Sequence, residues 1–457
     1  MLPYDQTLFG GLLVLIYFFS LGLNRTSVQW LMRKVLPKTR LNVQSEIHLL
    51  QLFFSLAGST IVFGYQASLA TLVCAIAMWG LHRSMHGSNR LVQPLTWLGM
   101  FGWLSYIHLT RPDGWTINIS GCVMLMTIRY TSFAGDRAKK LCEPSTLLEW
   151  LGWTFFIPSF FTGPTASLKE YRQWHDYVTL PVSDSTEPIV LVIVTGEHID
   201  IEHARPSNRA FVRALWYAPF VIIGQMTFPV MGVTKFLPSD GMLYRVFYAW
   251  IAMWCIKARY YLAWGVAEAA FSASEASRFV WHRGRNIDVW QVEMARSVHA
   301  VTKYWNICTA DWLKRYVYLP MRSLMDERGW RSVWAIVVTN VVSAGWHGIA
   351  PGYYATFISG GVCTAIGRLM HKHLDPRIDS IGSVALSHFY EVVMVLWTNV
   401  LVVTFGLPFQ LLSWKATWEA WRGLFFIGHV WLGAALLLVL GSIVLSRPAK
   451  DDKTKTE

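Results

Sequence analysis

The chain has 457 residues, of which 53% are hydrophobic and 15% are charged, and it contains 24 Trp and 25 Phe. This composition excludes an ordinary soluble protein and indicates a polytopic membrane protein. The net charge of +12 lies in short loops beside apolar runs, without a basic patch of interleaved aromatic residues, so anionic lipid headgroups are the expected counter-charge and no nucleic-acid partner is expected.

Apolar runs suited to the roughly 17–25 residues of a membrane-crossing helix recur along the whole chain. They are Leu8–Leu23, His48–Gly64, Leu69–Leu81, Pro94–Leu109, Trp115–Phe133, Leu148–Thr162, Phe211–Val233, Tyr244–Gly265, Arg331–Gly345, Tyr353–Gly367, Leu386–Phe409 and Leu424–Leu445. We expect an all-α fold with about eleven transmembrane helices and one or two re-entrant or broken runs. Pro158 and Pro164 make Leu148–Thr162 the weakest candidate.

The loops between the first runs alternate in charge. Basic residues follow the first, third and fifth runs, whereas the turns "YQAS" and "TRPDGW" carry almost none. Because basic loops stay in the cytosol, this pattern predicts a luminal N-terminus. The polar tail, residues 446–457, is then expected to be cytosolic, and Lys453 and Lys455 resemble a dilysine endoplasmic-reticulum retrieval signal.

Two internal blocks are too polar to cross lipid. The block Ser272–Arg331 places Trp and aliphatic residues at helical spacing among charges, which predicts helices along the interface or inside a polar chamber. Thr165–Asn208 has no clear periodicity. The six cysteines are scattered without a CxxC pair, so neither a disulfide framework nor a metal site is expected.

An ionisable residue inside an apolar run is costly and is therefore a candidate functional residue. Four histidines lie in such runs: His108, His347, His388 and His429. His347 stands out because Gly348 allows close approach of a substrate and Pro351-Gly352 breaks the helix beside the ring. A neutral imidazole there suits general-base catalysis, although a structural hydrogen bond is the commoner role of a single buried histidine.

Asn306, in "KYWNICTADWLKRYVYLP", is the second candidate. Its amide can orient a histidine or donate to a developing oxyanion, and the alternative is an ordinary bond to the backbone. Cys308 is a weaker candidate as an acylated nucleophile, because no activating base is evident near it in the sequence.

The segment "YWNICTADWLKRYVY", followed 41 residues after its Asn by the His of "SAGWHGIAPGYYATF", closely resembles the paired signature of membrane-bound O-acyltransferases, in particular the lysophospholipid acyltransferase branch. Four further segments fit the same branch: "MLMTIRYTSFAGD", "PSTLLEWLGWTFFIPSFFTGP", "KARYYLAWGVAEAA" and "NIDVWQVE". The sequence departs from the branch at "WHRG", residues 281–284, where an Asp usually follows the Trp. This departure leaves the headgroup preference open.

The resemblance implies a single membrane domain over residues 1–457 that surrounds an intramembrane chamber, with His347 and Asn306 as the catalytic pair. It also implies acyl-CoA entering from the cytosol as co-substrate, with no other cofactor, and a lysophospholipid arriving from the bilayer. Further residues are expected to line the substrate path: Trp305, Trp312, Tyr353, Tyr354 and Tyr261 along the acyl chain, with Lys314 and Arg315 near the CoA phosphates. Packing or lipid contact is an equally open role for each.

Three alternatives stay open. "HLTRPD", residues 108–113, matches the H-x4-D pattern of a different glycerolipid acyltransferase family but falls on the expected luminal side. A membrane-bound O-acyltransferase can also acylate a sterol, a diacylglycerol or a protein, and a lipid transporter would need two related halves, which the sequence lacks. The sequence does not distinguish a monomer from a homodimer, because an interface and a lipid-facing surface have the same composition.

Overall fold

The computed structural model describes residues 4–34, 43–85, 89–110, 118–142, 145–179, 207–280, 282–329 and 333–445. The N-terminal helices are α1 (Tyr4–Leu21), α2 (Arg25–Lys34), α3 (Val43–Phe63), α4 (Tyr65–Ser84), α5 (Asn89–Thr110), α6 (Ser120–Ala138), α7 (Leu147–Thr154), α8 (Ile157–Phe160) and α9 (Leu168–Thr179). The middle of the chain forms α10 (Ser207–Leu215), α11 (Ala218–Thr227), the 3₁₀ turn η2 (Val230–Thr234), α12 (Met242–Ala273) and η3 (Ala276–Arg278).

The remaining elements carry the candidate site and the C-terminal helices. They are α13 (Val289–Glu293), α14 (Val298–Tyr304), α15 (Ile307–Leu313), the π-helical turn η4 (Lys314–Tyr318), α16 (Leu319–Glu327), α17 (Val333–His347), α18 (Pro351–His373), α19 (Asp375–Ser380), α20 (Val384–Leu411), α21 (Trp414–Gly423) and α22 (Ile427–Leu445). The described residues thus form an all-α fold, in which the one β-type pairing is the isolated bridge between Ile287 and Trp305.

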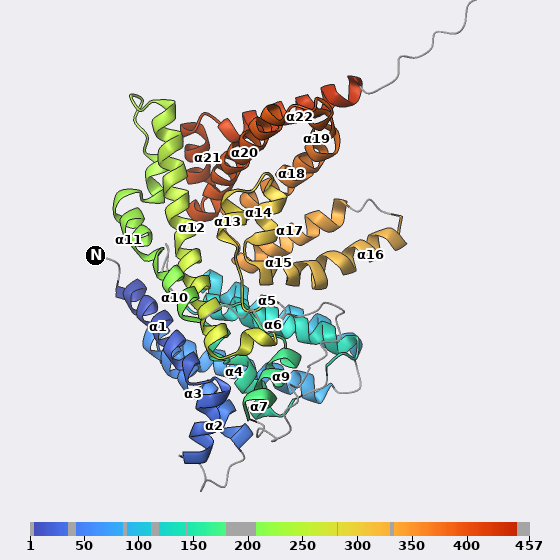
Figure 1. The fold of residues 1–457 in the computed structure, drawn as a ribbon. Coiled ribbons are helices and arrows are strands. Elements are labelled where there is room, and N and C mark those ends of the chain that lie inside the picture. Colours follow the sequence, from blue (N-terminus) through green and yellow to red (C-terminus); the bar gives the residue numbers. More distant parts are fainter. Residues whose placement is uncertain are drawn as a thin grey trace, which may run out of the picture.

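The long helix α12 joins two groups of helices (Figure 1). Its 32 residues extend for roughly 48 Å at 1.5 Å per residue. It contacts α1 and α10 in the N-terminal group and α20 in the C-terminal group. The short helices α13–α15 lie between the groups, beside α17. Part of the polar block predicted from the sequence, α13–α15, therefore lies at the junction of the two groups, whereas α16 is largely exposed.

Four helical segments in the described residues are long and apolar enough to cross a membrane: Ser45–Phe63, Asn208–Thr234, Val384–Leu411 and Ile427–Val444. The pair Thr7–Leu21 and Arg25–Leu31, bent by 72°, makes a fifth if it counts as one span. α17 has only 15 residues, and α12 carries charged residues such as Arg245 and Lys257 within its length. The expected number of about eleven crossings stays a prediction.

The weakest predicted span is broken in the structure. Residues 147–160 form the two short helices α7 and α8, and their aromatic side chains are almost fully buried. Trp150, Trp153, Phe155, Phe156 and Phe160 are each at most 1% exposed. Burial on all sides means that this segment packs inside protein and presents no face to lipid, as expected for a broken or re-entrant element.

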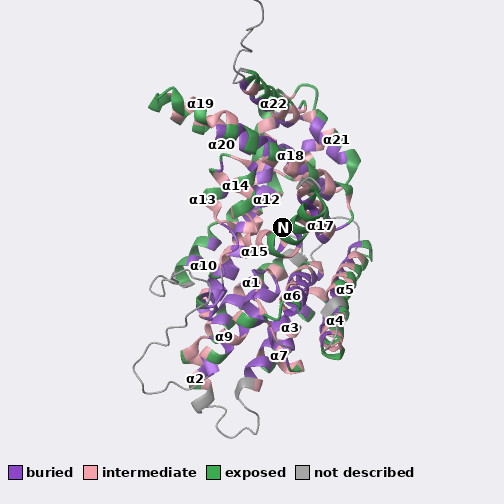
Figure 2. Ribbon diagram, turned by 90° about the vertical axis from the view of Figure 1, so that its right-hand side faces the viewer, coloured by how far each residue is buried: buried purple, intermediate pink, exposed green. Residues whose placement is uncertain are grey.

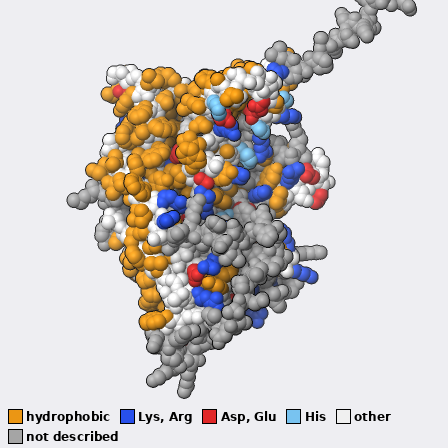
Figure 3. Space-filling view, viewed as in Figure 1, with side chains coloured by type: hydrophobic (Ala, Val, Ile, Leu, Met, Phe, Trp, Pro, Cys, Tyr) orange, Lys and Arg blue, Asp and Glu red, His pale blue; other side chains and the backbone are white. Residues whose placement is uncertain are grey.

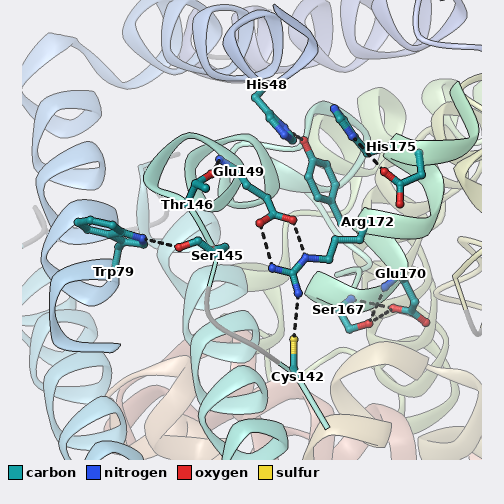
Figure 4. A network of polar contacts seen from close by, with 12 residues as sticks. His48, Trp79, Cys142, Ser145, Thr146, Glu149, Ser167, Glu170, Arg172 and His175 are labelled. Carbon is teal, nitrogen blue, oxygen red and sulfur yellow. Dashed lines mark hydrogen bonds and ion pairs between the residues drawn. The ribbon is translucent and has the colours of Figure 1, made fainter. Parts of the chain in front are cut away.

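A polar network fixes the turn from α7 to α9 (Figure 4). Arg172 on α9 makes a bidentate pair with Glu149 on α7, with N–O distances of 2.5 and 2.9 Å. The hydroxyl of Tyr171, the residue before Arg172, lies 2.8 Å from His48 Nδ1 on α3. About one turn further along α9, the His175 ring stacks on the His48 ring at 4.1 Å. These contacts hold α9 against α3 and α7. Most residues of α6 and α7 are buried, whereas α19 has no buried residue (Figure 2).

The basic ends of several helices share one side of the molecule. α6, α16 and α22 all end on the right of Figure 1, whereas the N-terminus lies on the left. Lys139, Lys140 and Arg328 directly follow α6 and α16. This arrangement agrees with the alternation of loop charge in the sequence, and the compartment that each side faces stays a prediction. The tail, including Lys453 and Lys455, lies outside the described residues.

Candidate active site

His347 is the last residue of α17, and aromatic rings surround its imidazole. Gly348 ends the helix with φ of +139°, and α18 begins at Pro351, where proline is favoured because the first helical position needs no N–H. The imidazole stacks on Phe357 at 5.3 Å and meets the edge of Phe409 at 4.8 Å. The ring is therefore held in an apolar enclosure at a break between two helices.

The structure also brings His108 to this break. His108, on α5, has Nε2 3.4 Å from the backbone oxygen of Trp346. Its ring packs against Gly348, where an added Cβ would lie 3.3 Å from His108 Cγ. The sequence places His108 on the side away from acyl-CoA, and its contact with the turn after His347 depends on a pairing of segments 238 residues apart. Asp113, the other residue of the H-x4-D pattern, lies outside the described residues.

Asn306 adopts the left-handed conformation, with φ of 48° and ψ of 56°, immediately before α15. Asn tolerates this region better than most residues because its short side chain bonds locally. Here the partner is Asn286, whose Nδ2 donates to Asn306 Oδ1 at 3.1 Å. The backbone N–H of Cys308 donates to Asn286 Oδ1 at 3.0 Å. The backbone N–H of Ile307 donates to the backbone oxygen of Asn286 at 2.9 Å. Asn286 thus anchors the whole turn.

Asn306 and His347 are connected indirectly, through two tryptophans that pack together and donate hydrogen bonds to α6. Among the described residues no hydrogen bond links Asn306 directly to His347. Trp312, on the helix that Asn306 begins, lies 6.0 Å from Trp346, the neighbour of His347. Both indoles donate to α6, Trp312 to Thr131 Oγ1 and Trp346 to the Met124 oxygen, each at 3.0 Å. α6 therefore fixes the position of one candidate residue relative to the other.

A family model described as MBOAT, membrane-bound O-acyltransferase family, matches residues 4–378. The chain belongs to the membrane-bound O-acyltransferase family. This confirms the resemblance seen in the sequence.

Several members of the family are similar in sequence to this chain, at modest identity. "Lysophospholipid acyltransferase" of Saccharomyces cerevisiae is 24% identical over 382 residues, which cover 74% of this chain and 60% of the yeast protein. "Lysophospholipid acyltransferase 2" of Arabidopsis thaliana is 24% identical, covering 87% and 88% of the two chains. "Membrane-bound glycerophospholipid O-acyltransferase 2" of Homo sapiens is 27% identical, covering 74% and 68%. The chain spans about 60% of the length of the two yeast relatives that it matches.

The aromatic residues predicted to line the substrate path divide into two groups in this family member. Tyr353 packs against His347 at 5.8 Å, and the Tyr354 hydroxyl lies near Gly345 on α17. Trp312 is buried beside Trp346. Trp305 instead packs on Tyr261 and two neighbouring rings of α12. The structure thus brings one group to His347 and the other to α12.

The two predicted cationic residues lie at the π-helical turn η4. Lys314 is exposed, and Arg315 pairs with Asp311 at 2.7 Å. Single π-helical turns occur frequently at functional sites. Burial, and secondly the positive charge of Arg315, lower the pKa of the nearby His282 from 6.5 to about 4. The imidazole of His282 is therefore neutral at physiological pH.

The two other histidines of the apolar runs lie away from this site. His388 is on α20 with its side chain 74% exposed, 3.6 Å from Glu391. His429, on α22, is enclosed by the rings of Phe405 and Trp421. In the described part of the chain, no ring contact or ion pair joins either histidine to His347, Phe357 or Phe409. His388 therefore provides a control for substitutions of His347.

The thiol of Cys308 is unsuited to nucleophilic catalysis. It is 7% exposed, and burial raises its pKa. Its Sγ lies 3.0 Å from the hydroxyl of Thr165, which cannot act as a base at neutral pH. A nucleophilic cysteine instead needs a depressed pKa or an adjacent base.

The sequence did not assign two residues that the structure makes prominent. Asn286 lies in the "NIDVWQVE" segment but had no role of its own. Glu293, at the end of the same segment, accepts from Lys257 Nζ at 2.7 Å and from the Tyr261 hydroxyl. The sequence does offer a signal for Glu293: its partner Lys257 is a charged residue within the apolar run Tyr244–Gly265, where an ion-pair partner is expected.

Proposed function

We propose that the chain is an acyl-CoA-dependent lysophospholipid O-acyltransferase that transfers a fatty acyl chain to the free glycerol hydroxyl of a lysophospholipid. The observation that carries the proposal is the position of His347, which ends α17 in an enclosure of aromatic rings. The names of the relatives support the substrate class. Exclusion of water by such rings favours acyl transfer over hydrolysis of the thioester.

In the proposed reaction His347 acts as general base. Its imidazole takes the proton of the lysophospholipid hydroxyl as that oxygen attacks the thioester carbonyl carbon. Collapse of the tetrahedral intermediate breaks the carbon–sulfur bond, and the thiolate of CoA leaves and takes the proton from the imidazolium. The new ester and free CoA account for all atoms, so neither a metal nor a covalent enzyme intermediate is required.

Asn306 stabilises the charge on the carbonyl oxygen. Because its Oδ1 accepts from Asn286, its Nδ2 group is directed elsewhere and remains a donor for an oxyanion. A hydrogen bond that is already oriented costs no reorganisation at the moment of reaction. Asn286 is therefore a positioning residue for Asn306.

Acyl-CoA binds on the basic side of the molecule. Lys314 and Arg315 at η4 lie close to the end of α6, where Lys139 sits over the Tyr316 ring at 6.0 Å. Arginine and lysine bind phosphate oxygens strongly. This side corresponds to the predicted cytosolic loops, so the protein takes acyl-CoA from the cytosol.

The direct experiment measures transfer in membranes that carry the full-length chain. Labelled acyl-CoA is supplied with lysophospholipids, a sterol and a diacylglycerol as separate acceptors. We expect labelled phospholipid from the wild type, a loss of about 10²–10⁴-fold for His347→Ala, and wild-type rates for His388→Ala. Wild-type activity in His347→Ala would overturn the assignment of the base. Acylation of a sterol or diacylglycerol alone would overturn the substrate class.

We further propose that the protein resides in the endoplasmic-reticulum membrane. Lys453 and Lys455, two residues apart in "KTKTE", resemble a receptor-read dilysine retrieval signal. Replacement of both lysines by serine should move a labelled protein to later compartments without reducing its activity. An unchanged distribution would remove the role of the tail.

A further inference from the structure

A cavity of about 840 Å³ opens between α10, α12, α13 and α20. Its volume lies within the roughly 300–1,000 Å³ of pockets that bind small ligands. Its lining includes Tyr261 but neither His347 nor Asn306. In the face shown in Figure 3, basic and acidic side chains interrupt the apolar surface at the height where α10 and α13 lie in Figure 1. Charged groups on such a face require a functional explanation.

Paired charges line the cavity. Arg213 Nη2 lies 3.1 Å from Glu268 Oε1, and Arg285 Nη2 lies 2.6 Å from Asp288 Oδ2. The side chain of Arg213 is 48% exposed, whereas that of Glu268 is only 10% exposed. The guanidinium groups therefore present open N–H donors at the mouth, and the carboxylates lie deeper.

The charges balance overall. Two guanidinium groups and three carboxylates line the cavity, and Lys257 neutralises the third carboxylate, Glu293, from behind at 2.7 Å. A ligand with separated positive and negative charges matches this lining. An anionic headgroup carries an additional negative charge, which would lie beside Glu268, Asp288 and Glu293 and be repelled by their carboxylates.

Indole rings add a site for a cation. Trp250, Trp254 and Trp290 line the same cavity, and Trp290 is 69% exposed. Aromatic faces bind ammonium groups, and quaternary ammonium ligands in particular. The cavity therefore combines donors for a phosphate with carboxylates and indoles for an ammonium group.

One segment connects the cavity wall to Asn306. Arg285 and Ile287 line the cavity, and Arg285 Nε donates to the Ile287 oxygen at 3.2 Å. Asn286 between them donates to Asn306, and Ile287 pairs with Trp305. Alternate residues of an extended segment point in opposite directions. A ligand in the cavity therefore lies against the segment that positions Asn306.

We propose that this cavity binds the headgroup of the lysophospholipid acceptor and selects zwitterionic headgroups, with phosphocholine and phosphoethanolamine preferred over anionic ones. The proposal rests on the proposed function and adds the acceptor class. The phosphate binds Arg213 and Arg285, and the ammonium group binds between Glu268 and the indole of Trp290. The glycerol then points to the inner wall formed by Tyr261 and Ile287, behind which Trp305 lies.

The test uses the full-length protein in membranes, with one acyl-CoA and four separate acceptors: lysophosphatidylcholine, lysophosphatidylethanolamine, lysophosphatidylserine and lysophosphatidylinositol. Wild type should use the first two with a higher kcat/KM. Arg213→Gln should raise the KM for zwitterionic acceptors about tenfold, with the KM for acyl-CoA unchanged. Trp290→Ala, on another element, should raise the KM for lysophosphatidylcholine about two- to fivefold. Arg209→Gln, one turn earlier on α10 and outside the cavity lining, is the matched control and should behave as wild type.

The outcomes separate this inference from the proposed function. A wild type that acylates none of the four acceptors refutes both. A wild type that prefers the anionic acceptors, or an Arg213→Gln variant with an unchanged KM together with an unaffected Trp290→Ala variant, refutes the headgroup cavity and leaves lysophospholipid acylation intact.

Discussion

Asn286 donates its side-chain amide to the Oδ1 of Asn306 at 3.1 Å. Asn286 is 3% exposed, and the same side chain accepts the N–H of Cys308. It therefore fixes both the left-handed turn at Asn306 and the direction in which the Asn306 amide donates. In the proposed mechanism Asn286 would act on catalysis through Asn306, 20 residues further along the chain.

Substitution of Asn286 separates these two contributions. Asn286→Asp keeps an acceptor for Cys308 but loses the donor to Asn306, so we expect kcat to fall about 10²-fold with little change in thermal unfolding. Asn286→Ala should lose both activity and stability, because the Cys308 N–H loses its partner. A kcat for Asn286→Asp equal to that of the wild type would show that Asn286 does not position Asn306.

Cys308→Ala should keep the transfer rate within a factor of about two, because the buried thiol with its raised pKa forms no acyl-enzyme. The backbone N–H that bonds to Asn286 is unaffected by the substitution. The measurements are acyl transfer and the amount of label that hydroxylamine releases from the protein. Asn306→Ala, which should lose most of its activity, is the comparison. Inactive Cys308→Ala with normal unfolding would instead favour covalent catalysis.

Gly348→Ala should impair both stability and activity. Gly348 has φ of +139°, where a side chain is strained, and an added Cβ would lie 3.1 Å from Tyr353 Cε2 and 3.3 Å from His108 Cγ. We expect a loss of about 1–3 kcal/mol in the free energy of unfolding and a displaced His347. Gly360→Ala on α18, where an added Cβ meets nothing within 4 Å, is the control and should be neutral or slightly stabilising. Equal behaviour of the two variants would contradict the close packing at Gly348.

His282 predicts a pH dependence of stability. Its pKa is lowered from 6.5 to about 4 by burial and by Arg315, so the unfolded chain takes up a proton at a higher pH than the folded chain does. Stability is therefore complete above about pH 6.5 and is lost as the pH falls towards 4, by up to roughly 3 kcal/mol. The unfolding temperature of the solubilised protein at pH of about 7.5 and about 5 checks this. His282→Gln should reduce the difference in unfolding temperature between the two pH values. If that difference is unchanged, other titrating groups cause it.

Local patterns predicted many helices because apolar composition and periodicity act over a few turns. Each predicted apolar run contains helix in the structure, and Pro158 correctly marked the broken run at α7 and α8. The number of membrane crossings is harder to predict from the sequence, because segments such as α12 and α17 combine protein-facing and lipid-facing surfaces in one stretch. Composition alone does not separate the two surfaces.

The sequence by itself determined the membrane class and the helical fold, since these depend on composition and local periodicity, and an ordered set of short motifs indicated the acyltransferase family. The catalytic pairing of His347 with Asn306, which that resemblance implies, stays a prediction. Only the tertiary structure decided that His108 packs against the turn after His347, that Asn286 orients Asn306, and that Arg213 and Glu268 meet in a cavity. These contacts join residues between 20 and 238 positions apart. They arise from the packing of whole helices, which no local pattern of side chains specifies.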